Sequence, residues 1–197
     1  LPPDADYFDD YPDHSIQRFR VLLSSDETRA VFVEALAVDK ADQELQLIAA
    51  ELQKPVVYST ERFGDLVLDR SVNWFAGETK WNGESIRVTF SVDDEDPDKD
   101  ALKTAETLWS NQAQWKERVE RFAVRELLDV KNDLWLGDDE SEFTAEQFIS
   151  RMTLTSVSVS SDGEFEFWYD DGDLFSGHAI MVSGNLQDGP NSSGIHG

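Results

Sequence analysis

Apolar and polar residues alternate most regularly between residues 63 and 92, which predicts a pair of antiparallel strands. Asn82-Gly83 supplies the positive φ angles of a two-residue type I′ turn. The apolar face of the second strand carries Ile86, Val88, Phe90 and Val92. The turn sets three opposed pairs: Trp81 with Glu84, Glu78 with Arg87, and Phe75 with Phe90. We therefore predict a ribbon with one buried and one polar face.

The period changes to that of a helix between residues 101 and 132. It predicts either one long helix or two helices broken near Ser110-Asn111, with Trp109 and Trp115 in the core. Thr144-Ala-Glu-Gln147 is a capping box, which predicts a short helix to about Met152.

Strand patterns return after this helix. Residues 154–161 predict a strand, Asp162-Gly163 a tight turn, and residues 164–186 a hairpin closed by a turn at Asp171-Gly172. Such a turn places Tyr169 opposite Leu174 and Phe165 opposite His178. We predict that this hairpin is the central ribbon of the domain.

The order strands, helices, strands favours an α+β fold: an antiparallel sheet of hairpins with helices packed on one face, and a small N-terminal subdomain. Four segments are expected along the chain. They are a flexible acidic arm (1–14), the small subdomain (15–60), the main α+β domain (61–189) and a loose Gly/Ser/Asn-rich tail (190–197).

The small subdomain has weaker signals. Residues 29–36 predict a strand, and residues 39–53 predict a helix that Pro55 stops. Residues 16–23 fit a strand or a helix.

Charge narrows the function classes. The chain has 41 acidic and 17 basic residues, a net charge of −24. Such a protein repels phosphate backbones and anionic membranes, so we expect no direct nucleic-acid partner and no membrane partner. Its field attracts a basic protein partner. Solubility or a halophilic habit explains the same charge without a partner.

The residue types that are missing exclude further classes of function. The chain has no cysteine, which removes disulfides, thiolate nucleophiles and Cys-ligated zinc. It has no membrane-span-length apolar run and no visible signal peptide, so a cytoplasmic location is expected, although a leader removed before Leu1 stays open. Dinucleotide, P-loop and zinc-protease motifs are also missing, so we expect no cofactor and assign no catalytic or metal-binding residue.

One cluster invites a chemical interpretation: Asp170, Asp171, Asp173 and His178, a candidate recognition or metal site. Carboxylates with one imidazole bind divalent metals or relay protons. The predicted register separates them, because His178 would lie about 15 Å along the strand from the turn. A turn plus a buried, hydrogen-bonded histidine is the favoured interpretation.

Two acidic runs form a candidate acidic interface. Its members are Asp93, Asp94, Glu95, Asp96, Asp138, Asp139, Glu140 and Glu142. The run from Asp93 to Asp100 resembles a calcium loop, but the Gly at the sixth position and the Glu at the twelfth, counted from Asp94, are missing. A solvated loop leading into a helix N-terminus is favoured there.

Several spaced motifs carry a family resemblance. They are Phe63-Gly64 with Asp65–Asp69, Trp74-Phe75, Trp81-Asn-Gly83, Leu127-Leu128, Lys131–Trp135, and Asp170–Phe175 with Gly177-His178. In this order they resemble an uncharacterised bacterial family, domain of unknown function 2262, over roughly residues 63–189. The resemblance implies a bacterial, cytosolic protein without an established activity, and it supplies no catalytic residues.

The leading functional hypothesis is an acidic, non-enzymatic protein-binding module, such as an immunity-type antagonist of a basic toxin or enzyme. Two alternatives stay open: a metal-assisted hydrolase built on the Asp170, Asp171, Asp173 and His178 cluster, and a decoy whose carboxylates mimic nucleic-acid phosphates. Whether the chain is an enzyme is left open, with the non-enzymatic reading favoured.

Overall fold

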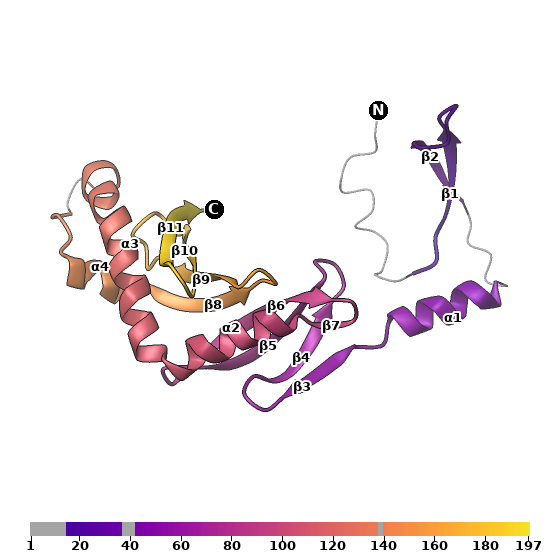
Figure 1. Ribbon diagram of the computed structural model, residues 1–197. Coiled ribbons are helices and arrows are strands. Elements are labelled where there is room, and N and C mark those ends of the chain that lie inside the picture. The colour runs from indigo at the N-terminus through magenta and orange to yellow at the C-terminus, as the bar shows by residue number, and fades with distance from the viewer. Residues whose placement is uncertain (1–14, 37–41, 138–139) are drawn as a thin grey trace. The chain divides into compact units, whose positions relative to one another are not determined.

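The computed structural model describes residues 15–36, 42–137 and 140–197 (Figure 1). The chain forms two compact units, Leu1–Pro55 and Val56–Gly197. The division falls five residues before the boundary that the sequence suggested at residue 60. The proposed arm, residues 1–14, lies outside the described residues.

The smaller unit contains a hairpin and a helix. Strands β1 (Arg18–Leu23) and β2 (Ala30–Leu36) pair antiparallel, which resolves the ambiguity over residues 16–23 and confirms the predicted second strand. Helix α1 (Gln43–Leu52) begins where the Asp42 side chain accepts a hydrogen bond from the Leu45 N–H. No residue of α1 is buried.

The larger unit is an α+β domain, as predicted. Its strands are β3 (Val57–Thr60), β4 (Gly64–Asp69), β5 (Trp74–Trp81), β6 (Glu84–Asp93), β7 (Asp96–Pro97), β8 (Thr153–Val159), β9 (Glu164–Asp170), β10 (Ala179–Asn185) and β11 (Gly189–His196). Its helices are α2 (Lys99–Ser110), α3 (Gln112–Leu134) and α4 (Ala145–Arg151). Two helices therefore replace the single long one, and they meet at Asn111, where the alternative of a break had been placed.

The strands form one nine-stranded sheet in the order β11-β10-β9-β8-β6-β5-β4-β3, with β7 paired to β6. Every neighbouring pair is antiparallel except β6 and β8. The prediction of hairpins alone missed this parallel pair. The chain leaves β6 through helices α2, α3 and α4 and returns beside it in the same direction, and a long helical connection is what a parallel pair requires.

The ribbon of β5 and β6 confirms the register that the sequence predicted. Trp81 lies opposite Glu84, Glu78 opposite Arg87, and Phe75 opposite Phe90. Asn82 and Gly83 have φ angles of 47° and 96°, the left-handed conformation that a type I′ turn needs at both positions.

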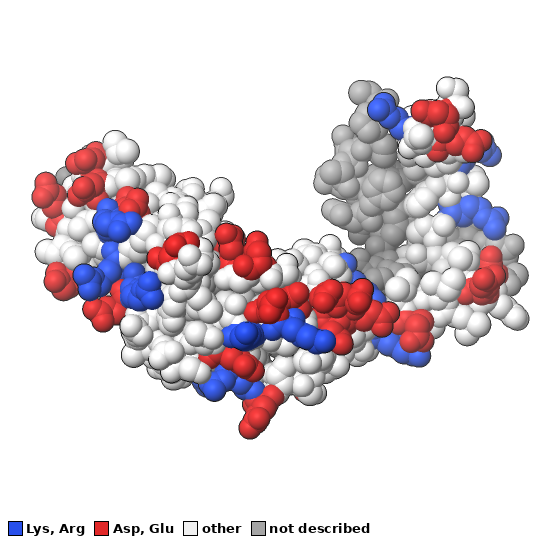
Figure 2. All heavy atoms as spheres, in the orientation of Figure 1, with Lys and Arg blue, Asp and Glu red and all other residues white. Residues whose placement is uncertain are grey.

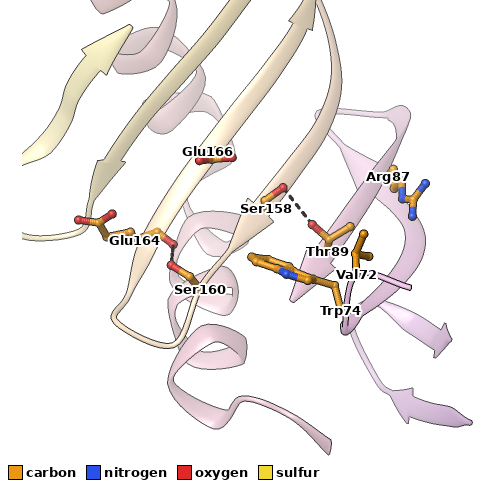
Figure 3. A pocket seen from close by; sticks show the side chains of 8 residues that line it. All are labelled: Val72, Trp74, Arg87, Thr89, Ser158, Ser160, Glu164 and Glu166. Atoms are coloured by element: carbon orange, nitrogen blue, oxygen red, sulfur yellow. Dashed lines mark hydrogen bonds between the residues drawn. The ribbon is translucent and has the colours of Figure 1, made fainter. Parts of the chain in front are cut away.

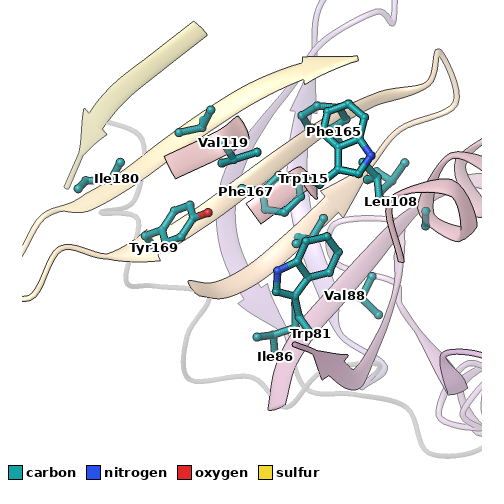
Figure 4. Close-up of a cluster of buried hydrophobic side chains, with 14 of the residues drawn as sticks. Trp81, Ile86, Val88, Leu108, Trp115, Val119, Phe165, Phe167, Tyr169 and Ile180 are labelled. Atoms are coloured by element: carbon teal, nitrogen blue, oxygen red, sulfur yellow. The ribbon is translucent and has the colours of Figure 1, made fainter. Parts of the chain in front are cut away.

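The core lies between one sheet face and the three helices. A cross-strand row of Val88, Val157, Phe167 and Val182 joins β6, β8, β9 and β10, and all four side chains are 0% exposed. Trp109 of α2 and Trp115 of α3 lie in the same core, and Figure 4 shows Trp115 among its side chains. Helices thus pack on one face, as expected, and the Trp pair is structural.

The predicted loose tail is wrong. Residues 189–196 form β11, an ordered edge strand that pairs with β10 and packs against α3. The Gly-rich composition serves close approach of the two strands: a Cβ at Gly184 would lie 2.2 Å from the carbonyl oxygen of Gly189. Glycine here permits pairing at a β-bulge between Ser183 and Gly184.

Candidate functional site

The segment from Asp170 to His178 is a loop, so the predicted two-residue turn at Asp171-Gly172 is wrong. Strand β9 pairs with Ala179–Asn185, which places Tyr169 opposite Ile180 and Phe165 opposite Gly184. The expected pairs of Tyr169 with Leu174 and Phe165 with His178 do not form. Gly172, Asp173, Ser176 and Gly177 all have positive φ angles, which fold the loop tightly.

This loop docks onto the helical side of the domain. Phe175 is fully buried, with ring centroids 5.6 Å from Trp135 and 6.1 Å from Phe148. The Arg151 side chain donates a hydrogen bond to the Gly172 carbonyl at 3.1 Å. A Cβ at Gly172 would lie 2.3 Å from the Arg151 carbonyl oxygen, so only glycine fits there.

The aspartates of the predicted cluster support the loop. Asp171 is 2% exposed, and its carboxylate accepts hydrogen bonds from the backbone N–H groups of Phe175 (2.5 Å) and Asp173 (3.1 Å). The Asp170 carboxylate accepts one from the Gly172 N–H at 2.9 Å. Asp173 is exposed. Within the described ranges, no group of three or more His, Asp or Glu residues could hold a metal ion.

His178 is half-buried, with its Nδ1 2.6 Å from the Phe175 carbonyl oxygen and its ring 5.6 Å from that of Trp135. Trp135 closes one family motif, and Phe175 and His178 belong to another. Two motifs that carry the resemblance therefore contact each other, and their contact is one of packing.

The two acidic runs lie far apart. Asp93, Asp94, Glu95 and Asp96 are exposed around the turn between β6 and β7. Glu140 and Glu142 lie in the segment between α3 and α4, at the opposite end of the larger unit (Figure 1). Asp138 and Asp139 lie outside the described residues. The described members of the candidate interface thus form no single surface. The first run leads into a helix, as expected, because the Asp98 side chain accepts a hydrogen bond from the Ala101 N–H and caps α2.

Glu140 has an internal partner. Its carboxylate accepts from the Gly137 N–H at 3.0 Å and from Lys131 Nζ at 2.7 Å, and Lys131 is 1% exposed. Lys131 also donates to the Trp135 carbonyl oxygen at 2.7 Å. These hydrogen bonds, the one from Gly137 first, hold the pKa of Glu140 below its usual value.

We expect the stabilisation from Glu140 to disappear in acid. A lowered native pKa means that the contribution is present above the unfolded-state pKa of about 4.3 and is lost as the pH falls through the lower native value. The difference in unfolding free energy between wild type and Glu140→Gln should therefore be largest near neutral pH and shrink below about pH 4. Urea unfolding across this range measures it. Glu142→Gln, exposed and without a described partner, is the control, and an equal, pH-independent loss in both variants would contradict the expectation.

The sheet face opposite the three helices is the second candidate region, here called the open face. Strand alternation puts Thr89, Ser158, Glu166 and Ser183 on it in one cross-strand row. The described helices of the larger unit pack on the other face, where the buried side chains lie. Sequence reasoning treated this side of β6 only as a polar face.

A groove of about 390 Å³ lies on the open face (Figure 3). Its lining residues are Val72, Trp74, Arg87, Thr89, Ser158, Ser160, Glu164 and Glu166. Figure 3 shows Arg87 on one side, Glu164 and Glu166 on the other, and Trp74 between them. Thr89 Oγ1 donates to Ser158 Oγ at 2.9 Å, which joins the two parallel strands beneath the groove.

The charges in this groove are largely free. Among the described residues, neither Arg87 nor Glu164 forms an ion pair, although Glu78 lies opposite Arg87 in the ribbon. Glu166 accepts one hydrogen bond, from Trp168 Nε1 at 2.9 Å. Trp74 is half-buried, and its indole N–H donates no hydrogen bond within the described part of the chain. A Trp on the polar face of a strand was the sequence signal for this site.

The fold and this groove define an α+β domain with a helix-covered face and an open, recessed face. The chain belongs to the family described as an uncharacterised protein conserved in bacteria, domain of unknown function 2262, whose model matches residues 60–195. This confirms the predicted resemblance and its extent. Neither a curated protein nor a solved structure matches the chain. Among the described residues, no helix is both long and apolar enough to cross a membrane.

Proposed function

We propose that this protein is an acidic, non-enzymatic module that binds a basic protein partner through the open face, as an immunity-type antagonist of a basic toxin or enzyme would. The groove carries the proposal. It combines an aromatic anchor, Trp74, with the carboxylates of Glu164 and Glu166, and a basic side chain of the partner fits between them.

The charge of this half of the sheet supports a basic partner. No Lys or Arg follows Arg151, whereas seven acidic residues do: Asp162, Glu164, Glu166, Asp170, Asp171, Asp173 and Asp188. Strands β8 to β11 therefore present negative charge without local compensation from their own residues. Such a field accelerates encounter with a basic surface and weakens as salt is added.

The open face also has the residue types that anchor interfaces. Trp168 and Met181 lie opposite each other on it, and the Trp168 ring lies 5.2 Å from that of His196. Aromatic residues and Met are enriched in interface centres, and a few of them carry most of the binding energy. The small Ser and Thr side chains around them leave the surface low enough for a partner to approach.

The alternatives have less support. The carboxylates of Asp170 and Asp171 accept backbone hydrogen bonds, so they are not free to bind a metal or activate water for a hydrolase. A nucleic-acid decoy needs a continuous acidic stripe, and on the face in Figure 2 acidic and basic side chains of the larger unit are interspersed. The proposal includes a bacterial cytoplasmic setting, which the lack of cysteine suits.

Affinity capture from the native host, followed by titration of the captured partner, tests the proposal. We expect a stoichiometric basic protein whose affinity falls with salt. Trp74→Ala should weaken binding by about thirtyfold, the effect of a hot-spot residue, and Glu164→Gln/Glu166→Gln by about tenfold. The charge-matched control is Asp129→Asn/Asp133→Asn, which removes two exposed charges from α3.

Two outcomes would count against the proposal. One is the lack of any stoichiometric partner under several growth conditions. The other is equal weakening by the α3 control, which would assign the effect to net charge instead of to the open face.

A further inference from the structure

A second cavity lies on the helical side of the domain, away from the open face. It has a volume of about 310 Å³ and is formed by the β5–β6 turn region, α3, α4 and the β8–β9 pair. Its apolar wall consists of Trp81, Ile86, Ile149, Met152 and Leu154. Ligand sites of small molecules are typically apolar cavities of about this size or larger with a few converging polar groups.

Two buried polar side chains face this cavity. Glu120 is 8% exposed, and its only described partner is Lys116, at 2.7 Å. Tyr169 is 2% exposed, and its hydroxyl forms no hydrogen bond within the described residues. Figure 4 shows the Tyr169 side chain among the core residues, on β9, the strand that also carries Phe167.

This arrangement is unusual for a purely structural core. Buried carboxylates normally accept several hydrogen bonds, and buried phenols normally have a partner. Burial, and to a smaller degree the nearby Glu120 charge, raise the pKa of Tyr169, so the phenol stays neutral while Glu120 supplies negative charge. Hydrogen-bonding capacity is left unused where the cavity meets the core.

We propose that this cavity binds a small hydrophobic primary amine. The apolar body of the ligand packs against Trp81, Met152 and Leu154, and its ammonium group donates to Glu120 and to the Tyr169 oxygen. A cation is favoured because two carboxylates, Glu84 and Glu120, line the cavity with one Lys, and because Glu120 is buried whereas its cationic neighbour Lys116 is not. Lys116 has a side-chain exposure of 48% and a flexible stem, so it leaves Glu120 for solvent when the ligand enters.

Three probes of similar shape separate the ligand classes: 2-phenylethylamine, the neutral 2-phenylethanol and the anionic 3-phenylpropionate. Binding to the full chain is followed by calorimetry and by chemical-shift changes at the Trp81 indole N–H and the Met152 methyl group. We expect the amine to bind most tightly and to shift both signals. Failure of the amine to bind at millimolar concentration, or tighter binding of the acid, would overturn the proposal.

Variants test the roles of the polar groups. Glu120→Gln keeps the shape and should weaken amine binding by about tenfold, and Tyr169→Phe should weaken it severalfold. Lys116→Gln should leave binding unchanged or tighten it, because it removes the competing cation. The control is Glu117→Gln, which removes an exposed carboxylate of α3 next to Lys116 in the sequence.

The Lys116→Gln variant shows whether the lysine competes with the ligand or binds it. Loss of amine binding in Lys116→Gln would show that the lysine holds the ligand, contrary to the proposal. The chemical-shift map on wild-type protein keeps the test valid if a core variant fails to fold.

Discussion

Phe167→Ala is expected to cost about 3–5 kcal/mol of unfolding free energy, the usual range for truncating a buried aromatic side chain. Phe167 is 0% exposed and lies at the middle of the cross-strand row between Val157 and Val182. Its ring lies 5.3 Å from that of Trp81 and 5.5 Å from that of Phe165. The substitution therefore opens a cavity where β9 meets the helix-packed core.

Chemical denaturation of both proteins measures this loss. Typical domains have total stabilities of about 5–15 kcal/mol, so the variant should be partly unfolded at moderate temperature. Val67→Ala is the matched control, since Val67 is an apolar strand residue of the same sheet but is 43% exposed. It should change stability by about 0.5 kcal/mol. Similar losses in both variants would mean that the covered face of the sheet is not the core.

Local patterns predicted the parts of this fold that depend on neighbours in sequence. Asn82-Gly83 fixed the β5–β6 register because a two-residue turn leaves no freedom in pairing. The capping box at Thr144 was also confirmed, with both reciprocal hydrogen bonds to Gln147 present. In both cases backbone geometry follows from residues within a few positions of one another.

The missed features depend on contacts between distant segments. The parallel pairing of β6 with β8 follows from how three helices return the chain. The composition of β11, rich in Gly and Ser, is typical of a loose tail. In the folded domain these small residues instead allow close packing against β10 and α3. The groove was missed because Trp74, Arg87 and Glu164 come from three strands, which only the assembled sheet brings together.

The loop from Asp170 to His178 shows the same limit at the candidate site. Asp171-Gly172 has the composition of a hairpin turn, and alternation continued on both sides of it. The competing factor was tertiary: Leu174 and Phe175 are buried against the helices, which removes them from the strand. The sequence correctly predicted that the chain turns at Asp171-Gly172. The length of the loop, however, depends on the buried position that Phe175 takes between Trp135 and Phe148.

Asp171→Ala is expected to destabilise the domain by about 2–4 kcal/mol, because the buried N–H of Phe175 and the part-buried N–H of Asp173 lose a charged acceptor at once. Both hydrogen bonds hold the loop in a conformation with four positive φ angles, and no other described group accepts from these two N–H groups. Loss of the loop anchor also exposes Phe175. Thermal and chemical unfolding should show the effect. The near-ultraviolet circular dichroism, to which Trp135 contributes, should change as its packing against Phe175 is lost.

Asp173→Asn, which tolerates the positive φ at this position, separates this structural role from a metal site. Asp173 belongs to the same acidic cluster but is exposed, and no described group hydrogen-bonds to its side chain, so its loss should change stability by about 0.5 kcal/mol. A metal site would respond differently: both variants would lose Mg²⁺, Mn²⁺, Ca²⁺ or Zn²⁺ binding in calorimetry, and His178→Ala would lose it too. Unequal stabilities without any cation binding are the expected pattern, because the carboxylate of Asp171 is already fully engaged by the backbone that it orders.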